Sequence, residues 1–371
     1  MQIFLEVKEM MILEADKIGS ATSPLKLTKT VAVVNANNQP KAGDVVVVRS
    51  LGESVTYGNL ELPNGRLAII NRGDVLLGVL GKRRALKGFV GDVPETIKSG
   101  DKLHLLNMGG VIGICKGHHS SLSDAITVEV LGIGCDENGT VLNIADHALP
   151  PTDVLNESAP IVIVAGTCMN SGKTVAATEI IKQAAHAGLK VAGAKMSGVA
   201  CLRDTLNMQD SGAEWTASFL DCGLPSTVDC GDLSPVAKAI LNHLNSFEPD
   251  LIVVELGDGI VGGYAVDSVL KDFEIRNAIS SFVFCASDYV GVIGGIQVLK
   301  NFGIEIDVIA GSVTDSQMGE DFVQSQYNIN AGNARRDGAR LFKLISNRMD
   351  RMNRIFASDF HPERPVHPVN F

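Results

Sequence analysis

The chain has 371 residues, of which 45% are hydrophobic and 20% are charged, and its formal net charge is −10 at pH 7. A single hydrophobic core seldom grows beyond about 250–300 residues, so we expect two domains. The apolar content argues against a disordered chain, and no apolar run approaches the ~20 residues of a membrane-spanning helix. The negative charge argues against a nucleic-acid partner, so any anionic ligand requires a local site.

Two features of the sequence indicate the compartment. The first residues lack the succession of basic start, apolar stretch and small-residue cleavage site that marks an export signal. Seven scattered cysteines form an odd set in a long chain, which is typical of reduced thiols. We therefore expect a cytoplasmic protein.

Short β-branched runs punctuated by glycine fill residues 1–146. They lie at 45–48, 67–70, 75–80, 103–106 and 111–114, and Gly-Asp pairs at 43–44, 73–74, 91–92 and 100–101 are candidate turns. Many short strands with few helical stretches predict a small β-rich domain, barrel-like or sandwich-like.

A different pattern follows a proline-containing linker at 147–160. Apolar runs alternate with helix-length segments such as 173–187, which predicts an α/β domain with a parallel sheet and helices on both faces. We place this domain at 161–352, with its last helix within 333–352, and expect an extended tail at 353–371. The apolar runs occur at 161–165, 191–194, 251–255, 281–286 and 307–310.

The most informative stretch is IVIVAGTCMNSGKT, residues 161–174, in which a buried-strand pattern, a glycine-containing loop and a helix follow one another. Backbone N–H groups and the helix N-terminus would face nucleotide phosphates, Lys173 would neutralise the β and γ oxygens, and Thr174 would ligate Mg²⁺. Five residues separate Gly166 from Gly172, where the usual motif has four. The residues expected to bind nucleotide are Gly166, Thr167, Asn170, Ser171, Gly172, Lys173, Thr174 and Val175.

This lengthened loop, Gly166-Thr167-x4-Gly172-Lys173-Thr174, resembles that of dethiobiotin synthetase and the related cobyrinate and cobyrate amide synthetases. The resemblance covers about residues 160–315 and leaves the first domain unmatched. It implies a P-loop NTPase-type fold with ATP and Mg²⁺ as cofactors. It also implies a homodimer, because these synthetases commonly place their substrates at a subunit interface.

Two residues at strand ends extend the resemblance. Lys195, in the segment GAKMSG, corresponds to a lysine that faces phosphate and substrate, so we expect it to be a second catalytic cation beside Lys173; an exposed surface lysine is the alternative. Glu255 ends the apolar run DLIVVE, where a carboxylate is costly unless it is paired or bound to metal. The resemblance implies that Glu255 binds Mg²⁺. Asp258, shortly after it, is either a second acid or a turn residue.

Further candidates lie between and beyond these strands. The segment 203–219 contains Asp204, Asp210 and Glu214, and Asp210 resembles the acid that helps to hold Mg²⁺ in dethiobiotin synthetase. The alternative is that acids in a first helical turn only interact with the helix dipole. Ser312 stands where the base-reading residues of that family lie.

A small basic run, Lys82-Arg83-Arg84 with Lys87, lies in the first domain. Such a run is usually a solvated surface, and the alternative is that it meets an anionic substrate at the cleft between the domains.

Together these signals predict an ATP- and Mg²⁺-dependent synthetase or ligase-like enzyme that activates a small carboxylate or carbamate substrate by phosphoryl transfer. A nucleotide-dependent switch or delivery protein and a small-molecule kinase are the alternatives.

Overall fold

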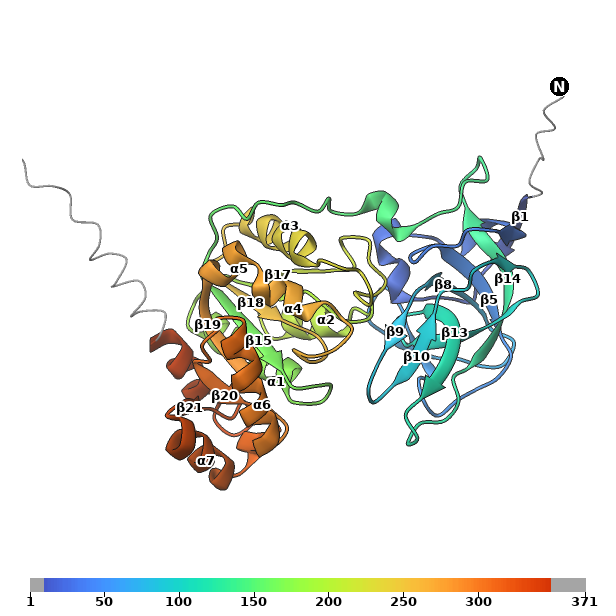
Figure 1. Cartoon of the computed structure of the whole chain (residues 1–371). Helices are drawn as coiled ribbons and strands as arrows, with labels where there is room; N and C mark the ends of the chain where they lie inside the picture. Colours follow the sequence, from blue (N-terminus) through green and yellow to red (C-terminus); the bar gives the residue numbers. More distant parts are fainter. Residues whose placement is uncertain (1–9, 348–371) are drawn as a thin grey trace, which may run out of the picture.

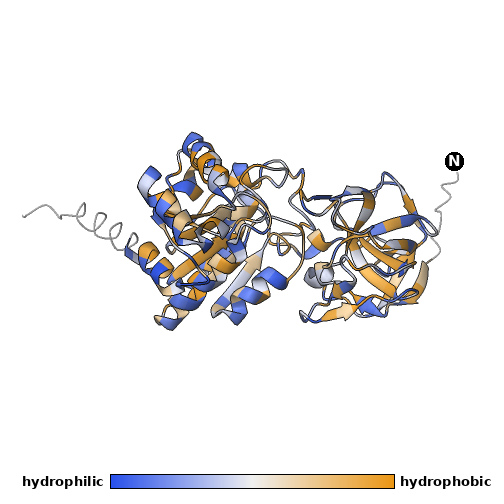
Figure 2. Ribbon diagram, turned by 90° about the horizontal axis from the view of Figure 1, so that it is seen from below, coloured by the Kyte–Doolittle hydropathy of each residue, from blue (hydrophilic) through white to orange (hydrophobic). Residues whose placement is uncertain are grey.

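The computed structural model describes residues 10–347 and has two domains side by side. In Figure 1 the β-rich N-terminal domain, blue to teal, faces the α/β domain across a seam, and a green segment connects them. Figure 2 shows hydrophobic residues concentrated in the strands of both domains and hydrophilic residues on the outer helices. In the described part of the chain, no helix is both long enough and apolar enough to cross a membrane.

The N-terminal domain is a closed β-barrel. Strand β5 (Val45–Ser50) pairs with β8 (Val75–Leu80) and β14 (Thr127–Cys135), and β8 pairs with β13 (Val111–His118). Strand β12 (Lys102–Asn107) pairs with both β13 and β14 and so completes the ring. The expected β-rich domain is confirmed, and it is a barrel.

Further elements complete the barrel domain. They are β1 (Met10–Glu14), β2 (Lys17–Ile18), η1 (Ser20–Leu25), β3 (Thr30–Val34), β4 (Ala36–Asn37), β6 (Asn59–Glu61), β7 (Leu67–Ile69), β9 (Arg83–Arg84), β10 (Phe89–Asp92), β11 (Ile97–Lys98) and η2 (Ile144–His147). Gly43, Gly73 and Gly100 have positive φ, as the Gly-Asp turns require, whereas Gly91 lies within strand β10. The prediction of a turn at 91–92 was therefore wrong.

Alternation along β5 links the barrel to the second domain. Val46 and Val48 belong to the cluster that fills the barrel. Val45 and Val47 point to the other face and join a buried cluster that continues into the α/β domain through residues such as Ile161. Since successive side chains of a strand point to opposite faces, one strand serves both cores.

The second domain has a seven-stranded sheet in the order β17-β16-β18-β15-β19-β20-β21, in which every pair is parallel. Its strands are β15 (Ile161–Gly166), β16 (Val191–Lys195), β17 (Ala213–Ser218), β18 (Leu251–Glu255), β19 (Ile279–Cys285), β20 (Val308–Ala310) and β21 (Asn330–Ala331). Its helices are α1 (Lys173–His186), α2 (Arg203–Asp210), α3 (Ser234–Asn245), α4 (Val266–Lys271), α5 (Phe273–Ala278), α6 (Tyr289–Asn301), η3 (Ser312–Asp315) and α7 (Gln317–Tyr327).

Helices cover both faces of this sheet, as predicted. Alternate residues of β15 separate into two clusters: Val162 and Val164 pack with α1, α2 and the helix at 338–347, whereas Ile161 and Ile163 pack with α3 to α6. The run of consecutive apolar residues in β15 therefore reflects burial on both sides.

Strand order places a crevice beside β15. From β15 the chain passes through α1 to β16, on the β18 side, and from β18 it crosses to β19 on the other side of β15. Ligands of open parallel sheets bind outside the carboxyl ends of the strands where the order reverses in this way.

The segment 148–160 has no helix or strand and runs beside α3. Asn242 and Asn245 of α3 accept hydrogen bonds from the backbone N–H groups of Asn156 and Ala159, both at 2.9 Å, so the segment is docked along its length. The expected last helix is present at 338–347, and its continuation and the tail at 353–371 lie outside the described residues.

Candidate functional site

The loop between β15 and α1 folds tightly around its own backbone. Gly172 has φ +102°, and a Cβ placed there would lie 2.9 Å from the Cα of Gly311. A Cβ on Gly166 would lie 2.5 Å from the Oγ of Ser171 and 2.6 Å from the carbonyl oxygen of Cys285. Neighbouring atoms therefore lie too close to both positions for a side chain, so each requires glycine. Gly172 requires it also because of its positive φ. The loop leads into the N-terminus of the 14-residue helix α1, a favourable place for an anion.

Lys173 is held inside this loop. Its side chain is part of a residue that is 5% exposed, and its Nζ donates a hydrogen bond to the carbonyl oxygen of Cys168 at 2.7 Å. Burial and the nearby Lys195 ammonium lower the pKa of Lys173 below its ordinary value. Beside it, the buried Oγ of Ser171 has no hydrogen-bond partner among the described residues. A bound anion would satisfy both groups.

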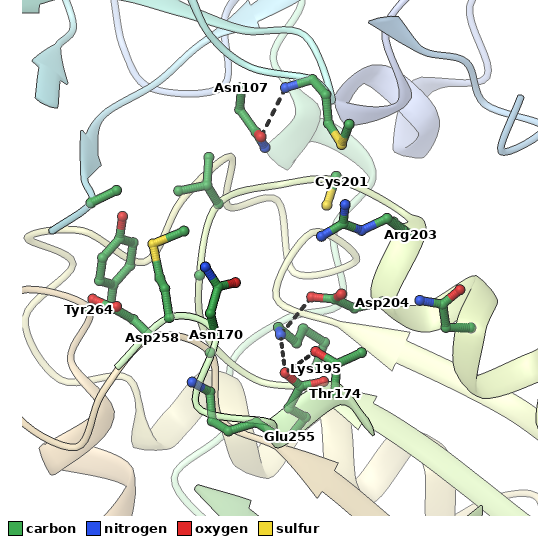
Figure 3. Close-up of a pocket in the computed structure, with 18 of the residues that line it drawn as sticks. Asn107, Asn170, Thr174, Lys195, Cys201, Arg203, Asp204, Glu255, Asp258 and Tyr264 are labelled. Carbon is green, nitrogen blue, oxygen red and sulfur yellow. Dashed lines mark hydrogen bonds and ion pairs between the residues drawn. The ribbon is translucent and has the colours of Figure 1, made fainter. Parts of the chain in front are cut away.

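A second cation lies at the end of the neighbouring strands. Lys195 and Glu255 are register partners at the ends of β16 and β18. The Nζ of Lys195 lies 2.7 Å from Oε1 of Glu255 and 2.6 Å from Oδ2 of Asp204, in the first turn of α2 (Figure 3). Burial acts to lower the pKa of Lys195, but the two carboxylates outweigh it and raise that pKa. The Lys195 ammonium in turn lowers the pKa of Asp204.

The donor set around Glu255 fits Mg²⁺. Thr174 Oγ1 donates to Oε1 of Glu255 at 2.9 Å, while the buried Oε2 of Glu255 has no partner among the described residues. Mg²⁺ is usually held by one or two carboxylates together with substrate phosphates and water, and P-loop proteins add the loop hydroxyl. The hydroxyl of Thr174 and the unpartnered oxygen of Glu255 are suitable donors for that ion.

The structure does not bring Asp210 to this site. Asp210 is the last residue of α2 and is exposed, whereas Asp204, near the start of the same helix, lines the cavity. The metal role expected for Asp210 therefore has no support in the geometry. Asp258 does line the cavity, at a turn with φ +61°, and burial raises its pKa.

These residues line one cavity of about 710 Å³ between the two domains. Its walls include the phosphate loop, the ends of β16 and β18, and the start of α2, together with Tyr57, Arg83 and Asn107 of the barrel domain. In Figure 3, Thr174, Lys195, Asp204 and Glu255 meet on one side of the cavity, and Asn107 lies on the opposite, barrel side. The volume is within the range of small-molecule sites.

The seam that closes this cavity is made of direct polar and backbone contacts. Asn107 Nδ2 donates to the carbonyl oxygen of Ala200 at 2.9 Å, and the N–H of Leu202 donates to Glu61 at 2.6 Å. A Cβ on Gly109 would lie only 2.1 Å from that same carbonyl oxygen of Ala200. The two backbones therefore touch beside the cavity.

The basic run also lies at the seam. Lys82 and Arg84 pair with Asp229 of the α/β domain at 3.1 and 3.6 Å, and the N–H of Arg84 donates to the Tyr264 hydroxyl. Arg83 is 4% exposed and lines the cavity. Lys82, Arg83 and Arg84 therefore lie at the seam between the domains, whereas Lys87 is exposed. Contact of the run with an anionic substrate stays a prediction.

A small second hollow adjoins the cavity at the start of α1. It shares Gly172, Val175 and Arg335 with the main cavity, and Ser312, Asp315 and Asn333 complete its wall. The structure thus places Ser312 next to the phosphate loop, where the sequence predicts contact with a nucleotide base.

Sequence reasoning missed several cavity residues. Tyr57, Asn107 and Arg203 carry no local motif, and only the folded seam brings them together. Asp204 had a usable signal, because the first turn of a helix that follows a strand end lies nearest the ligand edge of the sheet.

No family model and no curated protein matches the chain. Solved structures with a similar fold include the signal recognition particle receptor FtsY from Elizabethkingia anophelis, at 12% identity and a TM-score of 0.35 over 54% of this chain and 68% of that one. They also include the 54 kDa signal recognition particle protein from Aeropyrum pernix K1 in complex with GDP. It has 16% identity and a TM-score of 0.35, over 58% of this chain and 54% of that one. The cell division protein FtsY from Thermotoga maritima is similar at 12% identity and a TM-score of 0.34, over 49% of this chain and 64% of that one.

The chain thus spans from about half to about two thirds of the length of these proteins. None of the three is a dethiobiotin synthetase, so the comparisons do not support that finer resemblance. At such TM-scores the likeness carries no argument about function. From its strand, phosphate loop and helix in a parallel sheet, the second domain has the P-loop NTPase fold.

Proposed function

We propose that the protein binds a magnesium complex of a nucleoside triphosphate on the loop 166–174 and cleaves its γ-phosphoryl group. The observation that carries this proposal is the pair of half-buried Thr174 and buried Glu255, with one carboxylate oxygen left unpartnered beside a buried Lys173. Buried polar atoms without partners are rare in folded proteins unless a ligand completes them.

Each residue of the site has a role in this proposal. The loop amides and the α1 N-terminus bind the phosphates, and Lys173 offsets their charge. Thr174 and Glu255 hold Mg²⁺, which when bound neutralises charge that develops on the transferred group. Lys195 is fixed by Asp204 and Glu255, so it is oriented before the substrate arrives.

The cavity favours a small-molecule acceptor for the phosphoryl group. Its barrel-side wall, which includes Tyr57, Arg83 and Asn107, lies across from the phosphate loop and leaves space for a second ligand. We propose a carboxylate or carbamate acceptor and ATP as the nucleotide, with Ser312, beside the phosphate loop, contacting the base.

A nucleotide-dependent switch is the second candidate, and two exposed apolar segments favour it. Val261, after β18, and Val290, in α6, are more than two thirds exposed. Both segments contact Thr167 of the phosphate loop: Cβ atoms on Gly259 and Gly291 would lie 2.3 and 2.9 Å from its atoms. A change in the loop on nucleotide cleavage would reach this apolar surface and a protein bound to it.

Titration of the full chain with fluorescent ATP and GTP analogues, with and without Mg²⁺, tests the proposal. We expect binding that requires Mg²⁺ and is lost in Lys173→Ala, with Lys190→Ala, an exposed lysine on the same domain, as the matched control. The absence of binding to either analogue would refute the proposal. Phosphate release stimulated by a metabolite library favours the enzyme, and release stimulated only by a protein partner favours the switch.

A further inference from the structure

The cavity between the domains has a surplus of cationic side chains. Its lining includes five cationic residues and three acidic ones, although the whole chain carries a net charge of −10. The five are Arg83, Lys173, Lys195, Arg203 and Arg335, and the three are Asp204, Glu255 and Asp258. The cavity lining is thus positively charged although the whole chain is negatively charged, and this local positive charge indicates an anionic ligand.

Not all of these charges are available to the nucleotide. Lys195 is balanced by two carboxylates, and Lys173 sits within the phosphate loop. Arg83, Arg203 and Arg335 remain, and among residues 10–347 none of the three has a carboxylate within ion-pair distance. Arg335 also lines the small second hollow beside the phosphate loop, so Arg83 and Arg203 are the two considered for a second ligand. Arg83 comes from the barrel domain and Arg203 from the first turn of α2, so both domains contribute an unpaired guanidinium to the cavity.

Arg83 is a buried cation held only by neutral acceptors. Its Nη1 donates to the carbonyl oxygen of Leu106 and its Nη2 donates to the Tyr57 hydroxyl at 2.6 Å, with the guanidinium 4.8 Å from the centre of the Tyr57 ring. Its Nε has no acceptor among the described residues. The cavity carboxylate Asp258 interacts with Arg83 electrostatically but lies beyond ion-pair distance. A buried charge without a close counterion is costly, and an anion in the cavity would offset that cost.

Arg203 approaches the same space from the other domain. In Figure 3 its guanidinium extends beside Cys201 toward the cavity, above the cluster of Lys195 and Asp204. Arg203 is exposed and interacts electrostatically with the neighbouring Asp204, and no hydrogen-bond acceptor among the described residues holds its guanidinium. Planar guanidinium groups bind carboxylates through two parallel hydrogen bonds, which gives geometric selectivity as well as charge.

We propose that the acceptor is a small dicarboxylate, one of whose carboxylates binds between Arg83 and Arg203; this rests on the function proposed above. The other carboxylate reaches the phosphate loop. There its oxygen attacks the γ-phosphorus, the bond from that phosphorus to the β–γ bridging oxygen breaks, and an acyl phosphate and a nucleoside diphosphate form. The arginines thus select the substrate, while Lys173 and Lys195 stabilise the charge on the transferred group.

The test is thermal unfolding of the full chain saturated with Mg²⁺ and a non-hydrolysable ATP or GTP analogue. Linear dicarboxylates from propanedioate to hexanedioate are the probes, with the matching monocarboxylates as controls for ionic strength. We expect at least one dicarboxylate to raise Tm by about 2–4 °C, while no monocarboxylate does so. Arg83→Gln and Arg203→Gln should each abolish the shift, whereas Arg72→Gln, an exposed arginine on the barrel domain, should retain it.

Each outcome decides the matter. The proposal is overturned if no dicarboxylate shifts the wild-type Tm, or if both arginine variants keep the full shift. The readout is the shift on adding dicarboxylate, so a lower starting Tm of Arg83→Gln does not affect it, and Arg203→Gln carries the test if the first variant does not fold. Analogue binding is measured separately on the wild type: its absence refutes the nucleotide function, and its presence without a dicarboxylate shift refutes only the substrate class.

Discussion

Replacing Lys195 by methionine should destabilise the second domain strongly. Among the described residues, Lys195 is the only cation within ion-pair distance of two largely buried carboxylates, Asp204 and Glu255, whose side chains are 17% and 1% exposed, and the change removes it. Removing one partner of a buried ion pair typically costs about 3–5 kcal/mol. Protonation sets an upper limit, because neutralising one carboxylate of ordinary pKa near 4 at pH 7 costs about 4 kcal/mol. We therefore expect a loss of about 3–4 kcal/mol at pH 7.

The cost should also depend on pH. In the wild type Lys195 lowers the pKa of Asp204, and this contributes stability that is present above the unfolded pKa of the acid and is lost as pH falls through the folded one. In the variant that stabilising charge is gone, and burial favours the protonated acid. The difference in unfolding free energy between the two proteins should therefore shrink as pH is lowered from 7 toward 4.

Urea unfolding followed by tryptophan fluorescence measures this effect. Trp215 is the single tryptophan, and it lies in β17, the strand paired with β16. Lys190→Met changes an exposed lysine just before β16 and should alter stability by less than about 0.5 kcal/mol. A cost below about 1 kcal/mol for Lys195→Met, or a cost that does not change with pH, would refute the assignment of a buried ion-pair cluster.

Three further changes test the site. Lys173→Ala should weaken nucleotide binding at least about tenfold in a fluorescence titration, yet leave the urea midpoint unchanged or higher, since burial already lowers the pKa of this lysine; a lower midpoint would contradict this. Gly172→Ala should cost about 1–3 kcal/mol, measured by urea unfolding, because φ is +102° and the new Cβ meets backbone; wild-type stability would show that the loop is looser. Asp204→Asn should reduce the rate of nucleotide cleavage at saturating Mg²⁺, whereas Asp210→Asn should not. Equal effects of the two changes would instead support the metal role that the sequence predicts for Asp210.

The parts of the site that could be predicted from sequence are those fixed locally. The phosphate loop is one such part, since a buried strand, two glycines and Gly-Lys-Thr are contiguous. Lys195 and Glu255 are another, because each ends an apolar strand, and the ends of neighbouring parallel strands meet at one edge of the sheet.

The different positions of Asp204 and Asp210 have a simple geometric cause. Asp210 lies six positions after Asp204, which leaves the two side chains roughly 240° apart around the helix axis. The resemblance identified a helix that carries an acid, but the face of α2 that meets Lys195 depends on how the helix packs on the sheet. Sequence spacing alone does not contain that information.

The cavity residues on the barrel wall could not be predicted from the sequence for a different reason. The ring closes because β12 pairs with both β13 and β14, which is a long-range arrangement set by the whole domain. Arg83 is buried at the seam, whereas the sequence left open whether the basic run around it is a solvated surface or faces the cleft. Local patterns predicted the strands, and the tertiary structure decided which of their side chains reach the cavity.

The contact of Gly109 with the Ala200 carbonyl has a consequence for how such a protein can diversify. The backbones of the two domains are in direct contact at this point, so replacing side chains in either domain leaves the spacing between the domains unchanged. Selectivity for a new acceptor can therefore arise by exchanging groups on the barrel wall, at Tyr57, Arg83 or Asn107, while the nucleotide machinery opposite is inherited intact.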